Sequence, residues 1–347
     1  MKNIKYYKLI KLKILFIIIF IFYHLFIFYN YFFPYYYGKL PIVLNGIHIA
    51  MSLNNNYIFP IMVSITSILL NSRKTTSLYF HILIGKDVEI KNKRRIVSLT
   101  KLKNNSYFTF YDVGKNFIGW KHGEKKLTVA SFYRMIAAEL IRNVSKIIYL
   151  DGDTLIYDDL NEMYNLNISN LYFKGIREIV DNNLEIGMDK NKYICAGVLL
   201  MNLELMRIEN AFSKFRDYYL KFKNKGIYFG DQHIINDLFK DKIGFLPPKF
   251  GIWFIDDKDI ENYQKLNPII YSQNELIESI NRPVIRHIWG STKEGYLPDK
   301  PWLINNYYKI KEEWNYYAKK TAYYTLICKF YRKACINITN INYNTNK

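Results

Sequence analysis

Short hydrophobic stretches alternate with amphipathic ones over most of the chain. Residues 47–53, 78–85 and 106–113 have the apolar composition of buried strands, and residues 58–72 repeat apolar positions with a helical period. The order strand, helix, strand predicts a βαβ unit whose strands are parallel and joined by a right-handed crossover.

The alternation continues further along the chain. A helix is predicted at 128–141, a strand at 146–150, a strand leading into a helix at 196–206, and a further helix at 230–240. Strands that alternate with helices favour an α/β fold with a mixed, mostly parallel sheet. Because no repeat and no linker rich in Pro or Gly interrupts the pattern, we expect one catalytic-size domain over residues 45–305.

The N-terminal residues follow a different pattern. Residues 14–33 are almost continuously apolar, and about 20 such residues in a helix cross the hydrocarbon core of a bilayer. Five lysines precede this stretch and only Lys39 follows it closely, which places the N-terminus in the cytoplasm. We therefore expect a cytoplasmic tail at 1–13 and one transmembrane helix at 14–36, acting as a signal anchor, in place of a cleaved signal peptide or a buried helix. The rest of the chain would face the Golgi or ER lumen in a eukaryote, or lie beyond the inner membrane in a bacterium.

The overall charge carries little functional information. The net charge of +19 suits nucleic acid, a membrane surface or an anionic small molecule equally well. Frequent Lys, Asn, Ile, Tyr and Phe are also what an AT-rich coding sequence produces, so we expect no nucleic-acid partner. The cysteines at 195, 328 and 335 are too few and too scattered for a disulfide framework or a zinc site.

The C-terminal residues 306–347 form a basic, aromatic tail. Within it, residues 316–340 combine Tyr, Phe and Leu with five basic side chains. Two interpretations remain open: an amphipathic helix lying on an anionic membrane surface, or a helix docked on the domain.

Two aspartates directly follow the strand predicted at 146–150. In open α/β sheets the ligand lies outside the carboxyl ends of the strands, which is where Asp151 and Asp153 fall. Two carboxylates two residues apart can reach one hard cation such as Mg²⁺ or Mn²⁺. On this pattern alone, a metal site and a polar turn that caps the next helix are both open interpretations.

Two other aspartate motifs compete as explanations of the same stretch. A calcium-binding EF-hand loop is excluded because Leu155 and Ile156 occupy its fifth and sixth positions, where a polar ligand and a glycine belong. A phosphatase of the dehalogenase type uses an aspartate nucleophile after a strand, but its usual motif has no glycine between the aspartates and lies near the start of the domain. That phosphatase remains a lower-ranked alternative.

Several segments in the same order resemble the retaining glycosyltransferases of family 8, from about residue 46 to about residue 302. They are HIAMSLNNNYIFPIMVSITSIL, TVASFYRMIAAELI with the following NVSKIIYLDGDTLIYDDLNEMY, YICAGVLLMNL, GDQHIINDLF and RHIWGSTK. The resemblance implies a Rossmann-like nucleotide-diphospho-sugar transferase fold of the GT-A type. It also implies transfer of a hexose, with galactose or glucose favoured, from a UDP-sugar to a hydroxyl of a glycan, a lipid-linked saccharide or a glycoprotein.

The resemblance implies a metal and diphosphate site. Asp151, Asp153 and His287 would bind Mn²⁺, with Mg²⁺ as the alternative, and Gly152 would let the backbone approach the nucleotide. Gly290 and Lys293 are expected to close over the donor diphosphate, and Arg134 is expected to hold the donor. Lys300 is an alternative to Lys293, because the usual Lys-Pro-Trp sequence occurs only at 300–302.

The resemblance also implies contacts to uracil and sugar. The expected contacts to the nucleotide and the transferred sugar are Asn54, Asn56, Tyr57, Ala196 and Gly197. The residues expected at the reacting sugar are Gln232, Asp231 and Glu178. Asn54 replaces a frequent aspartate, and Cys195 replaces a usual asparagine, so the sugar specificity and even activity are open. The alternative is a catalytically inactive relative that still binds the sugar nucleotide.

Overall fold

A computed structural model of the chain describes residues 14–18, 20–24, 46–121, 128–178, 192–223, 230–252, 257–265, 270–288 and 308–331. The chain divides into two compact units, Met1–Ile42 and Val43–Lys347.

The first unit contains two short described stretches. Residues 14–18 and 20–24 are helical, and their apolar side chains are exposed. In the part of the chain that the structure describes, no helix is both long enough and apolar enough to cross a membrane. The expected tail at 1–13 and the remainder of the expected anchor at 14–36 lie outside the described residues, so the anchor stays a prediction.

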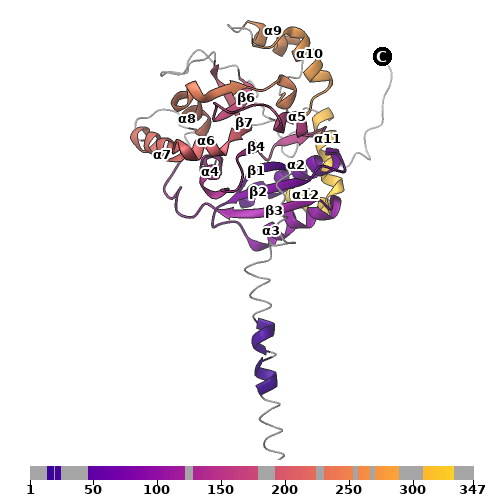
Figure 1. The fold of residues 1–347 in the computed structure, drawn as a ribbon. Coiled ribbons are helices and arrows are strands. Elements are labelled where there is room, and N and C mark those ends of the chain that lie inside the picture. The colour runs from indigo at the N-terminus through magenta and orange to yellow at the C-terminus, as the bar shows by residue number, and fades with distance from the viewer. Residues whose placement is uncertain are drawn as a thin grey trace, which may run out of the picture. The chain divides into compact units, whose positions relative to one another are not determined.

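The second unit is built around a seven-stranded sheet with the order β3-β2-β1-β4-β7-β6-β8 (Figure 1). Its strands are β1 (Ile47–Leu53), β2 (Leu78–Ile84), β3 (Ser106–Asp112), β4 (Lys146–Leu150), β6 (Phe173–Arg177), β7 (Ile194–Asn202) and β8 (Ile243–Phe245). A small second sheet pairs β5 (Thr154–Ile156) with β9 (Ile285–His287).

The helices in this unit connect and cover the strands. The α-helices are α2 (Ile58–Asn71), α3 (Ile90–Val97), α4 (Ala137–Leu140), α5 (Asn161–Tyr164), α6 (Leu203–Ile208), α7 (Ala211–Phe222), α8 (Asp231–Leu238), α9 (Asp257–Gln264), α10 (Gln273–Asn281), α11 (Tyr308–Lys320) and α12 (Tyr324–Phe330). Shorter 3₁₀ helices are η1 (Asn55–Tyr57), η2 (Ser98–Leu102), η3 (Val129–Ile136), η5 (Lys240–Lys242) and η6 (Pro248–Phe250).

The strand directions confirm the predicted mixed, mostly parallel sheet. Strands β3, β2, β1 and β4 pair in parallel, and so do β6 and β8, whereas β7 is antiparallel to both β4 and β6. The predicted βαβ unit is formed by β1, α2 and β2. All of β2 and nearly all of β1 are buried, as expected for strands covered on both faces. In Figure 1, α6, α7 and α8 lie on one side of the sheet and α2, α11 and α12 on the other.

The helix predicted at 128–141 is helical but not uniformly α. Its first part, η3, has 3₁₀ geometry, and only α4 winds as an α-helix. Five consecutive side chains of η3, from Phe132 to Ile136, are buried. A segment that is buried on most sides is not stabilised mainly by one apolar face, as an amphipathic α-helix is. Stretches of 3₁₀ geometry inside helices often mark functional positions. Arg134 lies in this stretch.

The C-terminal helices dock on the domain, which is one of the two alternatives for the basic tail. The apolar side of α11 packs on α2, and Trp314 is only 1% exposed. The amide of Asn71 in α2 donates to the hydroxyl of Tyr317, at 2.7 Å. Cys328 in α12 is disulfide-bonded, which the cysteine spacing did not predict.

Candidate metal and donor site

The predicted metal ligands come from three different places in the chain. Asp151 follows β4, Asp153 precedes β5, and His287 is the last residue of β9. The antiparallel pairing of β5 with β9 places Thr154 opposite His287. The peptide N–H of Ile288 donates to the carbonyl oxygen of Asp153, at 2.8 Å, which holds the two segments together beside the carboxylates.

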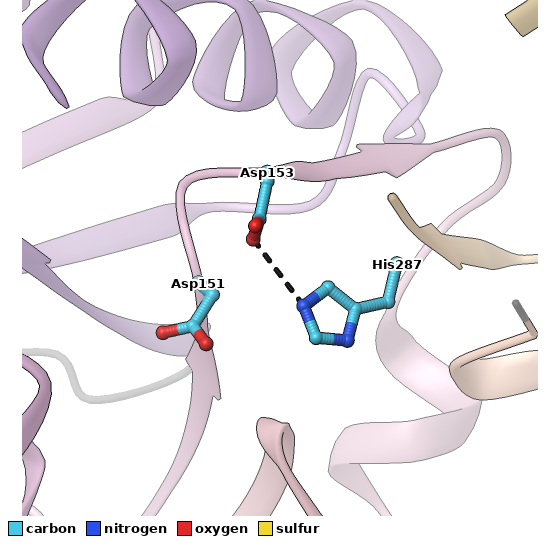
Figure 2. Close-up of side chains that lie close together, drawn as sticks. All are labelled: Asp151, Asp153 and His287. Carbon is cyan, nitrogen blue, oxygen red and sulfur yellow. Dashed lines mark ion pairs between the residues drawn. The ribbon is translucent and has the colours of Figure 1, made fainter. Parts of the chain in front are cut away.

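The three side chains lie close together, with the Asp153 carboxylate facing the imidazole of His287 (Figure 2). One ligand atom from each of Asp151, Asp153 and His287 lies within 4.8 Å of those from the other two. Nε2 of His287 is 3.3 Å from Oδ1 of Asp153. The Asp151 side chain is 28% exposed, while Asp153 and His287 are buried, so the site opens to solvent on the side of Asp151.

Arg134 fixes the position of Asp151 from the side of η3. Its guanidinium contacts Oδ1 of Asp151 at 3.0 Å and Oδ2 of Asp231 at 2.8 Å. It also donates to the carbonyl oxygen of Ala196 and lies over the ring of Tyr149, 4.3 Å from its centroid. Arg134 is therefore a buried cation that joins two carboxylates. Its expected contact with the donor stays a prediction.

The electrostatics of the cluster suit a cation. Burial raises the pKa of Asp151, and the Asp153 carboxylate raises it further, although Arg134 acts in the opposite direction. Burial opposes the charged form of His287, but Cys195 and Asp153 raise the pKa of the imidazole well above 6.5. Two carboxylates and an imidazole are ligands that Mn²⁺ takes, and the nitrogen donor suits Mg²⁺ less well. The residues therefore fit the predicted metal.

Tyr57 and Gly152 lie against each other beside the aspartates. The hydroxyl of Tyr57 donates to Oδ2 of Asp153, at 3.2 Å. A Cβ added to Gly152 would be 2.4 Å from Cγ1 of Ile61 and 2.9 Å from Cδ1 of Tyr57. The glycine thus lets the aspartate turn pack on α2 and on Tyr57. The expected approach to the nucleotide and the stacking of Tyr57 on uracil stay predictions.

Asn54 and Asn56 belong to the loop that contains η1. The side chain of Asn54 caps η1 by accepting from the N–H of Tyr57, at 3.0 Å, and donates to the hydroxyl of Thr128, at 2.9 Å. Asn56 is exposed, and its carbonyl oxygen accepts from the hydroxyl of Tyr331, at 3.0 Å. The structure thus gives both residues a role in shaping this loop.

The three residues expected at the reacting sugar form one connected group. The Gln232 side-chain oxygen accepts from the N–H of Ala196 at 2.9 Å, and its Nε2 donates to Glu178 at 2.8 Å and to the hydroxyl of Tyr193 at 3.3 Å. Asp231 is bound by Arg134. Because the Ala196 carbonyl oxygen also accepts from Arg134, the aspartate cluster and the Gln232 group are joined through β7.

Cys195 and Gly197 of β7 lie beside the imidazole of His287. Sγ of Cys195 is 3.5 Å from Nδ1. A Cβ added to Gly197 would be 2.2 Å from Cε1 of the ring, and the Gly197 carbonyl oxygen accepts from the N–H of Asp151, at 2.8 Å. Gly290, Lys293 and Lys300 lie outside the described residues, so their contacts to the diphosphate stay predictions.

Sequence reasoning missed two residues that support Asp151. The Tyr149 hydroxyl is 3.1 Å from Oδ1 of Asp151 and 3.0 Å from the hydroxyl of Ser52. Tyr149 is two residues before Asp151 and so lies on the same side of an extended strand, which is the signal that could have pointed to it.

Solved structures of other proteins share this fold. Solved structures with a similar fold include an apo structure of WbbM, a bifunctional glycosyltransferase, with a TM-score of 0.67 at 20% identity over 85% of this chain and 53% of that one. A galactosyltransferase, LgtC, solved with donor and acceptor sugar analogues, has a TM-score of 0.66 at 19% identity over 80% of this chain and 96% of that one. The fold is therefore that of glycosyltransferases.

The family follows from the sequence comparison. The family model for glycosyl transferase family 8 matches residues 48–305, and the chain belongs to this family. A putative glycosyltransferase of Haemophilus influenzae is 29% identical over 210 residues, which are 59% of this chain and 62% of that protein. The lipopolysaccharide 1,2-glucosyltransferase of Escherichia coli is 24% identical over 285 residues, 77% of this chain and 78% of the relative. Family membership replaces the phosphatase as an explanation of the aspartate pair.

Proposed function

We propose that this chain is a retaining glycosyltransferase that moves a hexose from a UDP-sugar to an acceptor hydroxyl. The observation that carries the proposal is the convergence of Asp151, Asp153 and His287 at the carboxyl end of β4. Ligands of α/β sheets bind at that edge, and this set of donors suits a cation that accompanies a diphosphate. Membership of family 8 supports the same reaction class.

Glucose or galactose is the proposed sugar, and the acceptor is a hydroxyl of a glycan, a lipid-linked saccharide or a glycoprotein. Support comes from relatives that are named a glucosyltransferase and a galactosyltransferase. The chain spans 62% of the length of the Haemophilus relative that it matches, so the sugar and the acceptor are part of this proposal.

Asp151, Asp153 and His287 would hold Mn²⁺, which when bound offsets the charge that develops on the departing diphosphate. Arg134 holds Asp151 in place from a buried position and opposes the rise in the pKa of its carboxyl, because the cation lies between two carboxylates. The Tyr57 hydroxyl orients Asp153. These residues act by holding the ligand set in one geometry before the donor arrives.

The residues beside the proposed sugar site favour a reaction without a protein nucleophile. Retention by double displacement needs a carboxylate presented to the anomeric carbon. Asp231 is paired with Arg134, while the oxygen of Gln232 accepts from Ala196 and its amide binds Glu178. We propose instead that the acceptor attacks from the face that the leaving diphosphate vacates. Gln232→Ala should then slow the reaction without abolishing it, whereas a sugar adduct trapped on a carboxylate would contradict this route.

The decisive assay follows release of UDP and of inorganic phosphate from a panel of UDP-sugars, with and without Mn²⁺. We expect UDP release that requires Mn²⁺ and is lost in Asp153→Ala, with no phosphate release. UDP binding without turnover would instead identify a catalytically inactive relative. The sequence arguments for that alternative are Cys195, Asn54 and the late position of Lys-Pro-Trp at 300–302. Phosphate release without nucleotide preference would contradict both.

We further propose that residues 14–36 anchor the chain in a membrane with its N-terminus in the cytoplasm. The support is the apolar stretch at 14–33 and the five lysines before it. The domain would then meet its acceptor on the far side of the Golgi, ER or bacterial inner membrane.

A further inference from the structure

Cys195 contacts a metal ligand but lies away from the other two. It belongs to β7, and its thiol is 3.5 Å from Nδ1 of His287. The opposite ring nitrogen, Nε2, faces Asp153 at 3.3 Å. The thiol is therefore on the side of the imidazole that points away from the carboxylates, so Cys195 is not placed as a fourth ligand of the same cation.

The contact decides which nitrogen of the imidazole can bind a cation. A neutral imidazole carries one proton, and only the nitrogen without that proton has a lone pair for a metal. When the Nδ1–H donates to Sγ of Cys195, the lone pair is on Nε2, directed towards Asp153. Partners of this kind on the second ring nitrogen fix the tautomer and the ring orientation of metal-binding histidines.

Strand β7 holds the ring in a second way. Alternate residues of a strand face the same side, so Cys195 and Gly197 both face His287. The ring fills the space where a side chain at position 197 would be, with 2.2 Å between its Cε1 and a Cβ built there. Gly197 thus sets where the ring lies, while Cys195 sets how it is turned.

We propose that Cys195 is a positioning residue for the metal ligand His287, accepting a hydrogen bond from Nδ1–H so that Nε2 is presented to the cation. This inference rests on the proposed metal site of the glycosyltransferase. It gives a structural role to the residue at which the sequence departs from the asparagine that relatives of this family usually have.

The test measures binding of Mn²⁺ alone to the full chain in detergent, by electron paramagnetic resonance of the free ion. Cys195→Ala removes the acceptor, and we expect Mn²⁺ affinity to fall about 10- to 100-fold. Cys195→Ser keeps an acceptor of similar size, and we expect affinity within about threefold of the parent. Tyr172→Phe is the control, because it also removes one polar atom from a buried side chain, and the Tyr172 hydroxyl donates to Glu209, which is outside the proposed site. This variant should leave Mn²⁺ affinity unchanged.

The outcomes separate this inference from the proposed function. Parent-like Mn²⁺ affinity in Cys195→Ala, with binding lost in Asp153→Ala, overturns the positioning role and leaves the metal site intact. An equal loss in Cys195→Ser and Cys195→Ala also overturns it, since the loss would then not follow the acceptor. If Mn²⁺ affinity falls in Cys195→Ala and is kept in Cys195→Ser, but the parent chain transfers no sugar, the positioning role is supported and the transferase proposal is rejected. A parent chain that binds no Mn²⁺ overturns both.

Discussion

The imidazole of His287 lies against Gly197 of β7. Even the single Cβ of an alanine at position 197 would overlap with the ring. We predict that Gly197→Ala weakens Mn²⁺ binding by at least about tenfold, because the ring must move to remove a 2.2 Å contact. Titration of the protein with Mn²⁺ measures the effect.

A double-mutant cycle tests the cause. In a His287→Ala background the obstructing ring is gone, so Gly197→Ala should cost little further stability in urea unfolding. If Gly197→Ala destabilises the two backgrounds equally, the glycine is required for the backbone and the contact with His287 is not the reason.

For single residues, the sequence predicted the cluster of Asp151, Asp153 and His287 but not the contacts of their neighbours. Asp151, Asp153 and His287 were expected together from the order of family segments, and the structure brings them together. The contact of Arg134 with two carboxylates and the packing of Gly152 on Ile61 were not expected. These depend on how η3 and α2 lie on the sheet, which residue identities alone do not specify.

Among the structural elements, β1 and β2 carry a buried polar pair within an apolar sheet. Nδ1 of His48 lies 2.9 Å from Nε2 of His81, and Nδ1 of His81 lies 3.0 Å from the hydroxyl of Tyr111. Burial lowers the pKa of His48 to about 4, and burial together with His48 lowers the pKa of His81 to about 3. Both rings are therefore neutral in the folded protein at neutral pH.

We predict that this pair makes the domain sensitive to mild acid. In the unfolded chain both histidines take up a proton near pH 6.5, while in the folded chain they do so only near pH 3 to 4. Their contribution to the free energy of unfolding is fully present above pH 6.5 and decreases as the pH falls. At pH 5 the free energy of unfolding is lower by about 2 kcal/mol for each histidine.

Urea unfolding at pH 7.5 and pH 5 checks this sign and size. Between pH 7.5 and pH 5, the free energy of unfolding should fall by about 4 kcal/mol less in the double variant His48→Gln/His81→Gln than in the parent. In the single variant His81→Gln it should fall by about 2 kcal/mol less than in the parent. An unchanged pH dependence in the double variant would assign the acid sensitivity to other groups.

Helix α12 supports the loop expected to contact uracil. The hydroxyl of Tyr331, one residue beyond α12, donates to the carbonyl oxygen of Asn56 at 3.0 Å, and the ring of Phe330 packs edge-on against Phe59. We predict that Tyr331→Phe weakens UDP binding about 2- to 10-fold, the value of one hydrogen bond, and leaves Mn²⁺ binding unchanged.

Calorimetric titration with UDP measures the difference. Tyr316→Phe in α11 is the matched control, because Tyr316 is 54% exposed and should give parent-like UDP affinity. Equal affinities in all three proteins would show that α12 does not hold the loop in its binding conformation.

The elements themselves were largely predictable, and their pairing was not. The predicted strands at 47–53, 78–85, 106–113 and 146–150 match β1 to β4 closely. A strand has the same residue pattern in either direction, so the antiparallel β7 could not be read from it. The three-residue strands β5 and β9 are too short for any periodic pattern, although their pairing brings Asp153 and His287 together.

For the whole molecule, the division at residue 42 separates the apolar N-terminal residues from the domain. We predict that the full chain sediments with membranes and resists extraction by alkaline carbonate, because residues 14–36 are expected to cross the bilayer. A chain that starts at Val43 should stay in the supernatant. If both chains sediment and carbonate releases both, the attachment is peripheral and does not depend on the N-terminal residues.

The pairing of β5 with β9 joins parts of the chain that are made at different times. Asp153 and His287 are 287 − 153 = 134 residues apart, so both aspartates leave the ribosome long before the histidine is synthesised. Contacts over such separations form late and slow folding. A nascent or truncated chain that ends before β9 has two carboxylates but no complete ligand set. Metal uptake by this protein would therefore report that translation and folding have reached the end of the catalytic domain.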